Sequence, residues 1–126
     1  MRHFITATLV LVGIIHLLPL VGVLGSPKLS ELYGISVSEQ NTEILMRHRA
    51  VLFGLLGGFL VFAAFNPSFQ VAGFIAGFVS VASFLLLAFS VGQYNSQLSR
   101  VVVADILALF LLVSGGVALV LSKRVA

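Results

Sequence analysis

Long apolar stretches separated by short polar segments form the main pattern along the chain. Four such stretches are visible, at about residues 4–24, 39–65, 71–92 and 101–121. About 20 apolar residues are enough for an α-helix to cross a hydrocarbon core ~30 Å thick, so each stretch predicts a membrane-spanning helix. The second, third and fourth stretches follow one another through short connections. The pattern therefore predicts an all-α integral membrane protein, a single domain over residues 1–126 that forms an antiparallel four-helix bundle.

The first apolar stretch begins like a secretory signal peptide, with a basic residue followed by an apolar run. The run from Phe4 to Leu24 is nevertheless longer than the apolar core of a signal peptide, which has about 7–15 residues. Because further spans follow, this stretch is interpreted as a retained first helix. Pro19 is expected to kink it, which a membrane helix tolerates where neighbouring groups satisfy the freed carbonyl.

The connection after the first stretch is predicted to be an extramembrane loop over residues 26–38. Within it, Ser30–Tyr33 is expected to form one interfacial turn, with Tyr33 at the level of the lipid headgroups. Ser38 is the predicted N-cap of the second helix, and Glu39 would lie in its first turn, where the helix dipole favours an acidic side chain.

Composition supports a bilayer as the solvent of this chain. Hydrophobic residues make up 60% of it and charged residues only 9%, whereas soluble domains average about 25% charged residues. A soluble domain of 126 residues could not bury so much apolar surface. The net charge of +3 comes from scattered basic residues at helix ends, without a Lys/Arg stripe, so no nucleic-acid partner is predicted. The absence of cysteine excludes disulfides, thiol catalysis and cysteine-ligated metal sites.

The basic residues also bear on membrane orientation. An even number of spans places both termini on one side of the membrane. Three basic residues belong to that side: Arg2, Lys123 and Arg124. Four belong to the other: Lys28, Arg47, Arg49 and Arg100. The count is close to a tie, but Arg2 directly before the first span and the Lys-Arg pair after the last favour cytoplasmic termini in a bacterial inner membrane.

Small residues at four-residue spacing predict where the helices approach one another. The second stretch has Gly54 and Gly58, and the third and fourth have comparable Gly or Ala pairs. Residues seven and eleven apart lie within about 20° of each other on a helix, so Arg47 is expected on the same face as Gly54 and Gly58. Asp105 is expected over the packing face of the last helix. Both side chains would then point into the bundle, as charges at membrane depth usually do.

A polar cluster in one leaflet half is the candidate ligand-binding site. Its six predicted members are His16, Glu43, Arg47, His48, Arg49 and Asp105. Asp105 is expected to pair with Arg47 or Arg49, either as a structural salt bridge or as part of a pocket for a carboxylate, phosphate or lipid headgroup. Alternatively, Glu43 and Arg47 pair with each other on the helix surface, at i and i+4. The opposite half, around Asn66-Pro67, is predicted to be almost without polar features.

The histidines and serines have plainer interpretations beside the functional ones. His16 is expected to be a hydrogen-bonded packing residue, with joint haem ligation by His16 and His48 as the weaker hypothesis. His48 is expected at the interface, or as a neutral proton-relay group. Ser80 and Ser83 are predicted to make hydrogen bonds between helices. No metal site is predicted because HExxH, an Asp/Glu cluster and a Met-rich tract are all missing.

The residues around the second stretch resemble those of a known group of proteins. LYGI at residues 32–35, a short acidic spacer and ILMRHRAVLFGLLG at residues 44–57 are similar to a set of small proteobacterial membrane proteins over residues 32–58. In size, span count and glycine-rich second span the chain resembles the DoxX-like group. The small multidrug exporters are excluded because their first span carries a glutamate, whereas this first span has no acid and the chain has no tryptophan.

Three functions follow from these observations. The leading hypothesis is a non-catalytic binding protein or accessory subunit that holds a lipid-like or anionic small molecule, with the bilayer, further copies or a larger membrane complex as partners. No catalytic motif supports an enzyme, since P-loop, GxGxxG and GxSxG patterns are missing. The DoxX-like resemblance implies the second hypothesis, a redox protein with a quinone or haem b. The third is a small proton-coupled transporter that uses the ionisable cluster.

Overall fold

The computed structural model describes residues 1–125, and Ala126, the last residue of the predicted domain, lies outside the described part. In chain order the elements are α1 (Arg2–Leu17), the 3₁₀ helix η1 (Leu18–Leu24), α2 (Ser26–Tyr33), α3 (Gln40–Ala64), the 3₁₀ helix η2 (Pro67–Phe69), α4 (Gln70–Val91) and α5 (Ser96–Val125). Across residues 1–125 every element is helical, which confirms the predicted all-α class. Four helical segments are long and apolar enough to cross a membrane: Arg2–Leu24, Gln40–Ala64, Pro67–Val91 and Ser96–Arg124.

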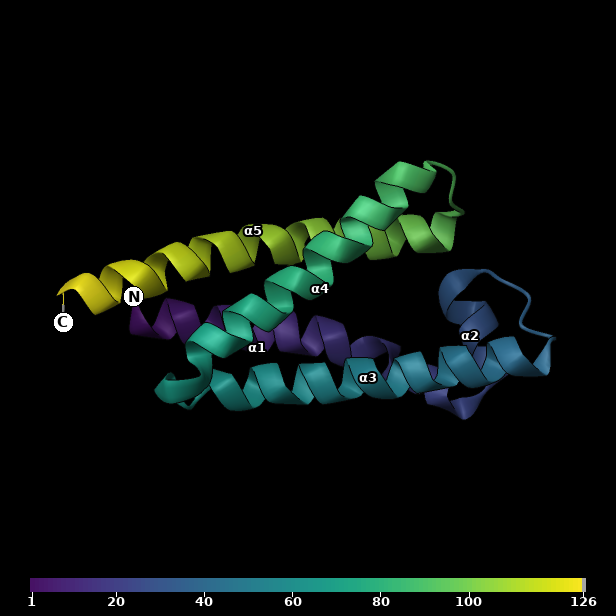
Figure 1. The fold of residues 1–126 in the computed structure, drawn as a ribbon, viewed down its shortest axis with the longest axis horizontal. Helices are drawn as coiled ribbons and strands as arrows, with labels where there is room; N and C mark the ends of the chain where they lie inside the picture. The colour runs from purple at the N-terminus through teal and green to yellow at the C-terminus, as the bar shows by residue number, and fades with distance from the viewer. Residues whose placement is uncertain (126) are drawn as a thin grey trace.

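The long helices lie along one another, and both chain ends are at the same end of the molecule (Figure 1). We call this the terminal end, and the opposite end, where α2 packs beside the first turns of α3, the α2 end. Helix α1 contacts α3 and α5, and α4 contacts α3 and α5. Figure 1 also shows that the axis of α4 leans away from α3 toward the α2 end.

Pro19, which the sequence predicts to kink the first helix, lies where the α-helix changes to a 3₁₀ helix. The α-helical hydrogen bonding of α1 ends at Leu17, and the chain continues as η1 with Pro19 in its first turn. Proline has no backbone N–H to donate to the preceding turn, so the regular α-helix cannot continue through it. The turn predicted at Ser30–Tyr33 is part of a longer helix, since α2 has eight residues and its C-cap is Gly34, whose φ of 65° suits glycine.

Glu39, and not the predicted Ser38, caps the N-terminus of α3. The two carboxylate oxygens of Glu39 accept hydrogen bonds from the backbone N–H of Asn41 at 2.9 Å and of Thr42 at 2.8 Å. The Thr42 hydroxyl donates a further bond to the same carboxylate, at 3.0 Å. A carboxylate satisfies two of the free donors at a helix start, whereas one serine hydroxyl accepts from one of them. These bonds hold the pKa of Glu39 below its ordinary value, with the Asn41 N–H as the largest cause.

The closest approach between α1 and α3 occurs at Gly13 and Gly57. A Cβ atom added at Gly57 would lie 2.7 Å from the carbonyl oxygen of Gly13, so no side chain fits there. Gly54 also lies on this face, because an added Cβ would be 2.6 Å from Leu20. The prediction for Gly58 was wrong, since an added Cβ there would meet no atom within 4 Å. The packing face of α3 therefore passes through Gly54 and Gly57.

Helix α4 packs against α3 and α5 through glycines that the sequence predicts for close packing. An added Cβ at Gly73 would lie 3.1 Å from the Cβ of Ala63, and one at Gly77 would lie 3.2 Å from Leu112. Ala108 of α5 is fully buried. Helix α5 begins at Ser96, earlier than the predicted span at residue 101, because Asn95 accepts the N–H of Leu98 at 2.8 Å.

Candidate functional site

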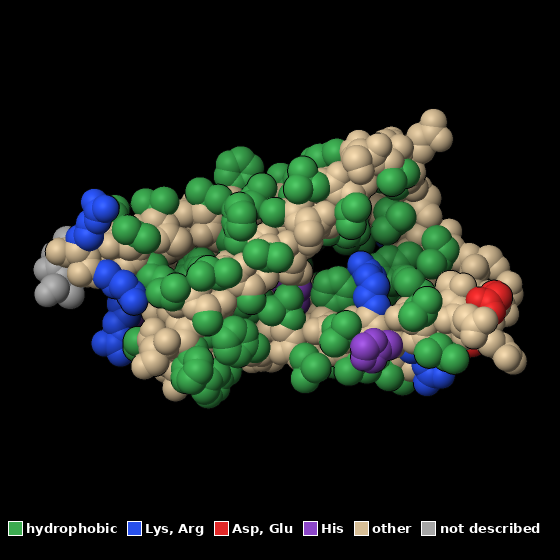
Figure 2. Space-filling view, in the orientation of Figure 1, with side chains coloured by type: hydrophobic (Ala, Val, Ile, Leu, Met, Phe, Trp, Pro, Cys, Tyr) green, Lys and Arg blue, Asp and Glu red, His purple; other side chains and the backbone are tan. Residues whose placement is uncertain are grey.

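A cavity of about 390 Å³ lies toward the α2 end, where α4 leans away from α3. We call it the polar cavity. Its polar lining residues are His16, Glu31, Tyr33, Arg49, Ser80, Arg100 and Asp105. Its apolar lining residues are Ile15, Leu18, Pro19, Leu32, Phe53, Phe84, Val101 and Ala104. Figure 2 shows a hollow on the face between α3 and α4, with Lys/Arg and His side chains at its edge.

Every element from α1 to α5, apart from η2, contributes to this cavity. Helix α2 folds back from η1 and contacts both η1 and α5, so that Tyr33 forms part of the wall. The side-chain amide of Asn95 donates to the carbonyl oxygen of Tyr33 at 2.7 Å, which ties the end of α2 to the start of α5. The wall of the cavity thus includes a short helix whose docking position the local sequence pattern does not predict.

His16 forms the buried floor of the cavity. Its ring is 3% exposed, its Nδ1 atom lies 2.9 Å from the carbonyl oxygen of Val12, and its Nε2 atom lies 2.9 Å from the Ser80 hydroxyl. Because a carbonyl oxygen only accepts, Nδ1 carries a proton and donates, which leaves Nε2 to accept from Ser80 in the neutral ring. The prediction of a hydrogen-bonded packing histidine is confirmed. Ser80 is confirmed as an interhelical partner, but the Ser83 hydroxyl donates to Ser80 O within α4.

Arg49 is the arginine of α3 that faces the cavity. Its Nη1 atom donates to the hydroxyl oxygen of Tyr33 at 2.9 Å. Its guanidinium carbon lies 4.5 Å from the ring centre of Phe53 and 5.3 Å from that of Tyr33. Such contacts between a guanidinium and ring faces are favourable and hold the side chain in one orientation. Tyr33 is only 5% exposed, so its side chain packs inside the protein, where its ring contacts the Arg49 guanidinium.

Asp105 lines the same cavity from α5 and is half-buried. Within residues 1–125, the ion pairs at 4.0 Å or less join Lys28 to Glu31 and Arg47 to Glu43, and neither includes Asp105. The predicted salt bridge from Asp105 to Arg47 or Arg49 is therefore not formed. Asp105 and Arg49 share a cavity, but Arg49 is held by Tyr33 and Phe53 instead.

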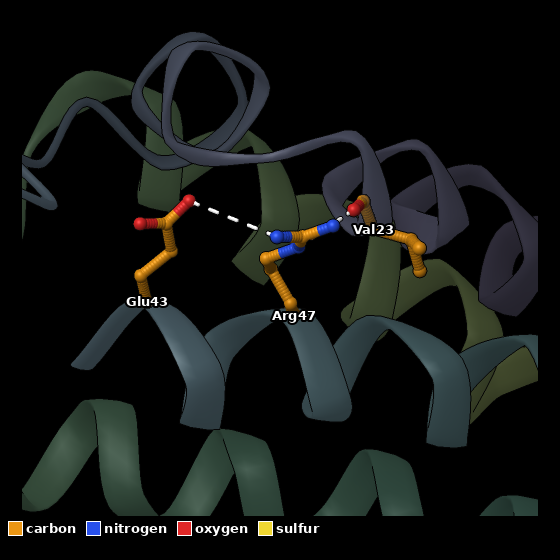
Figure 3. Close-up of polar contacts among 3 residues, drawn as sticks. All are labelled: Val23, Glu43 and Arg47. Atoms are coloured by element: carbon orange, nitrogen blue, oxygen red, sulfur yellow. Dashed lines mark hydrogen bonds and ion pairs between the residues drawn. The ribbon is translucent and has the colours of Figure 1, made fainter. Parts of the chain in front are cut away.

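Arg47 points away from the polar cavity, toward the end of η1 (Figure 3). Its Nε atom donates to the carbonyl oxygen of Val23 at 2.8 Å, and its Nη1 atom lies 4.0 Å from the Glu43 carboxylate. The last carbonyl groups of a helix lack partners within the helix, and a cation there is favoured. The prediction that Arg47 faces inward was wrong, whereas the alternative pairing with Glu43 is confirmed. Two residues on, Arg49 lies about 200° further around the helix and faces the other way.

Three of the six predicted site residues therefore meet at the cavity: His16, Arg49 and Asp105. Glu43, Arg47 and His48 are not among its lining residues, and His48 is exposed. His16 lines the polar cavity and His48 does not, so these two histidines do not face each other across it. In residues 1–125 no group of three or more His, Cys, Asp or Glu side chains is arranged to hold a metal ion. Sequence reasoning missed Tyr33, Glu31 and Arg100 as wall residues.

The terminal end also carries polar groups, contrary to prediction. A second cavity of about 370 Å³ lies there, lined in part by Arg2, Thr6 and Gln70. The Thr6 hydroxyl and the Gln70 amide each donate to the carbonyl oxygen of Ala64, both at 3.2 Å. Ala64 is the last residue of α3, so its carbonyl has no partner within the helix. Donors from α1 and α4 satisfy it, and this joins three helices.

Comparisons of the chain with protein-family models, with curated proteins and with solved structures find no match.

Proposed function

We propose that this chain is a multi-pass protein of a bacterial inner membrane, with its long helices inserted as an antiparallel four-helix bundle and both termini in the cytoplasm. The four apolar helical segments support insertion. Arg2, Lys123 and Arg124 lie together at the terminal end, where Figure 2 shows blue side chains gathered, and this supports the orientation. The proposed type is the DoxX-like group that the sequence resembles.

We propose further that the protein is a non-catalytic binding protein, alone or as an accessory subunit, and that the polar cavity holds the head of a lipid-like molecule with an anionic group. The observation that carries this proposal is the position of Arg49 in a cavity with largely apolar walls. The volume of about 390 Å³ lies within the range of about 300–1,000 Å³ typical of ligand sites.

The chemistry of Arg49 suits an anion. A guanidinium has five N–H donors in a plane, and Tyr33 takes a bond from Nη1, so donors remain for a carboxylate or phosphate. The rings of Phe53 and Tyr33 keep the group ordered before the ligand arrives, which lowers the entropy lost on binding. Arg100 lies at the rim as a second cation.

The test is native mass spectrometry of the protein purified in mild detergent, with co-purified molecules identified after release. We expect a bound amphiphile with an anionic group, and loss of most of its occupancy in Arg49→Gln. Arg47→Gln is the matched control, because it removes the same charge two residues away on a face outside the cavity. Equal occupancy in both variants, or no bound amphiphile in the parent protein, contradicts the proposal.

A second candidate ligand is a quinone, in line with the DoxX-like resemblance. The observation that favours it is the presence of Phe53, Phe84 and Tyr33 rings beside hydrogen-bonding groups in one cavity. A planar quinone ring stacks on such rings, and its carbonyl oxygens accept hydrogen bonds. An organic extract of the purified protein tests it, since a bound quinone changes its ultraviolet absorbance on reduction with borohydride. An extract without this change excludes the quinone.

A further inference from the structure

Asp105 is an acidic residue in an apolar helix, and the parts of the chain described here give it no ion pair or hydrogen bond. Acidic groups at membrane depth are costly unless they face a partner or water. Arg49 lines the same cavity but lies beyond ion-pair distance of Asp105, and its guanidinium contacts Tyr33 and Phe53 instead. The polar cavity therefore presents a fixed cation and an unpaired anion on different helices, α3 and α5.

We propose that the ligand of this cavity is zwitterionic, an aminophospholipid whose phosphate binds Arg49 and whose primary ammonium group binds Asp105. This inference rests on the function proposed above and specifies the chemical class of its ligand. A phosphate offers several acceptor oxygens to the guanidinium, and an ammonium group offers three donors to the carboxylate. A headgroup that carries both charges can contact both walls of the cavity at once.

The other charges of the cavity support a lipid headgroup that carries both a positive and a negative charge. Arg100 adds a cation at the rim, on the same helix as Asp105. Glu31 adds an anion from α2, and its carboxylate lies 3.6 Å from the Lys28 ammonium, which compensates it. With Glu31 compensated by Lys28, Asp105 is the lining acid left for a cationic group, and Arg49 and Arg100 are left for an anionic group, so the lining suits a headgroup that carries both signs.

The acyl chains would leave through the open side of the cavity. Figure 2 shows the hollow on the face where α4 leans away from α3. Large apolar side chains of α4 are exposed, including Leu86 at 71% and Leu87 at 66%. An amphiphile lying in the bilayer can place its head in the cavity and its chains along this apolar face.

The experiment measures binding to delipidated protein by native mass spectrometry, with short-chain phosphatidylethanolamine, phosphatidylglycerol of the same chains, and inorganic phosphate as probes. We expect the parent protein to bind the ethanolamine lipid roughly tenfold more tightly than the glycerol lipid, as one additional charge-assisted contact allows. Asp105→Asn should remove this preference and leave binding of the glycerol lipid unchanged. Arg49→Gln should weaken both lipids. Glu43→Gln is the control, because that acid lies outside the cavity.

The outcomes separate this inference from the proposed function. The parent protein could instead bind both lipids equally, with no change in Asp105→Asn. That result overturns the proposal of a zwitterionic ligand and leaves the proposal of an anionic ligand standing. Binding of neither lipid overturns both proposals. If inorganic phosphate binds as tightly as the lipids, the ligand is a soluble anion, and the proposal of an amphiphilic ligand is overturned. A circular dichroism spectrum equal to that of the parent establishes that each variant is folded.

Discussion

The Nε2 atom of His16 lies 2.9 Å from the hydroxyl oxygen of Ser80, and this contact joins the last turn of α1 to the middle of α4. Both residues line the polar cavity. The position of α4 thus depends on a polar contact here, whereas closer to the terminal end it depends on the contact of Gly73 with Ala63. This arrangement makes the cavity sensitive to a single hydroxyl group.

Ser80→Ala should lower the free energy of unfolding by about 1 kcal/mol, because it leaves the buried Nε2 atom of His16 without a partner. Thermal unfolding in detergent, followed by circular dichroism, measures the effect. Ser83→Ala is the matched control, since its hydroxyl bonds only to a carbonyl of its own helix. Equal stability of the two variants would show that the interhelical bond contributes nothing.

Gly57→Ala and Gly58→Ala should differ in sign, although the two positions are adjacent. The added methyl group at Gly57 would meet the Gly13 backbone at 2.7 Å and force α1 and α3 apart, which costs about 1–3 kcal/mol. At Gly58 the methyl group meets nothing within 4 Å, so the gain in helix propensity of up to about 1 kcal/mol remains. Thermal unfolding of both variants checks this, and a destabilising Gly58→Ala would place the contact face of α3 elsewhere.

Much of the fold could be predicted from sequence because its signals are local. Apolar length identifies the four helical segments that are long enough to cross a membrane, and Pro19 marks the point where α1 gives way to η1. The N-cap of α3 was misassigned because Ser38 and Glu39 are adjacent and both have side chains that accept hydrogen bonds. Which one turns back toward Asn41 and Thr42 depends on backbone geometry that the residue types alone do not specify.

The site was harder to predict because it depends on helix rotation and on α2. Arg47 and Arg49 lie on opposite faces of α3, so only one of them can face the cavity. Alignment with Gly54 and Gly58 favoured Arg47, but α1 packs against Gly57, and Gly58 is exposed. Tyr33, which orients Arg49, comes from a helix whose docking is a tertiary contact without a local signal.

Lowering the pH should loosen the first turn of α3. The pKa of the Glu39 carboxyl is lowered from 4.5 by the N–H groups of Asn41 and Thr42. A group with a lowered pKa in the folded state stabilises it above the ordinary pKa, and the effect is lost as the pH falls through the lowered value. The amide resonances of Asn41 and Thr42 should therefore titrate together with a midpoint below 4.5. In Glu39→Gln this titration should disappear, and its persistence would identify another group.

Asp105→Asn should leave the unfolding temperature of delipidated protein unchanged or slightly raised. A buried salt bridge that loses one partner typically costs about 3–5 kcal/mol, because the remaining charge is left uncompensated. In this chain Arg49 is held by Tyr33 and Phe53, so removal of the Asp105 charge strands no partner and relieves an unpaired acid. Thermal unfolding measures this effect. Ser80→Ala, in the same cavity, is the positive control, because it is expected to lower the stability of the protein. A loss of several kcal/mol in Asp105→Asn would mean that Arg49 and Asp105 do form the salt bridge, and the empty cavity would then need no cationic ligand group.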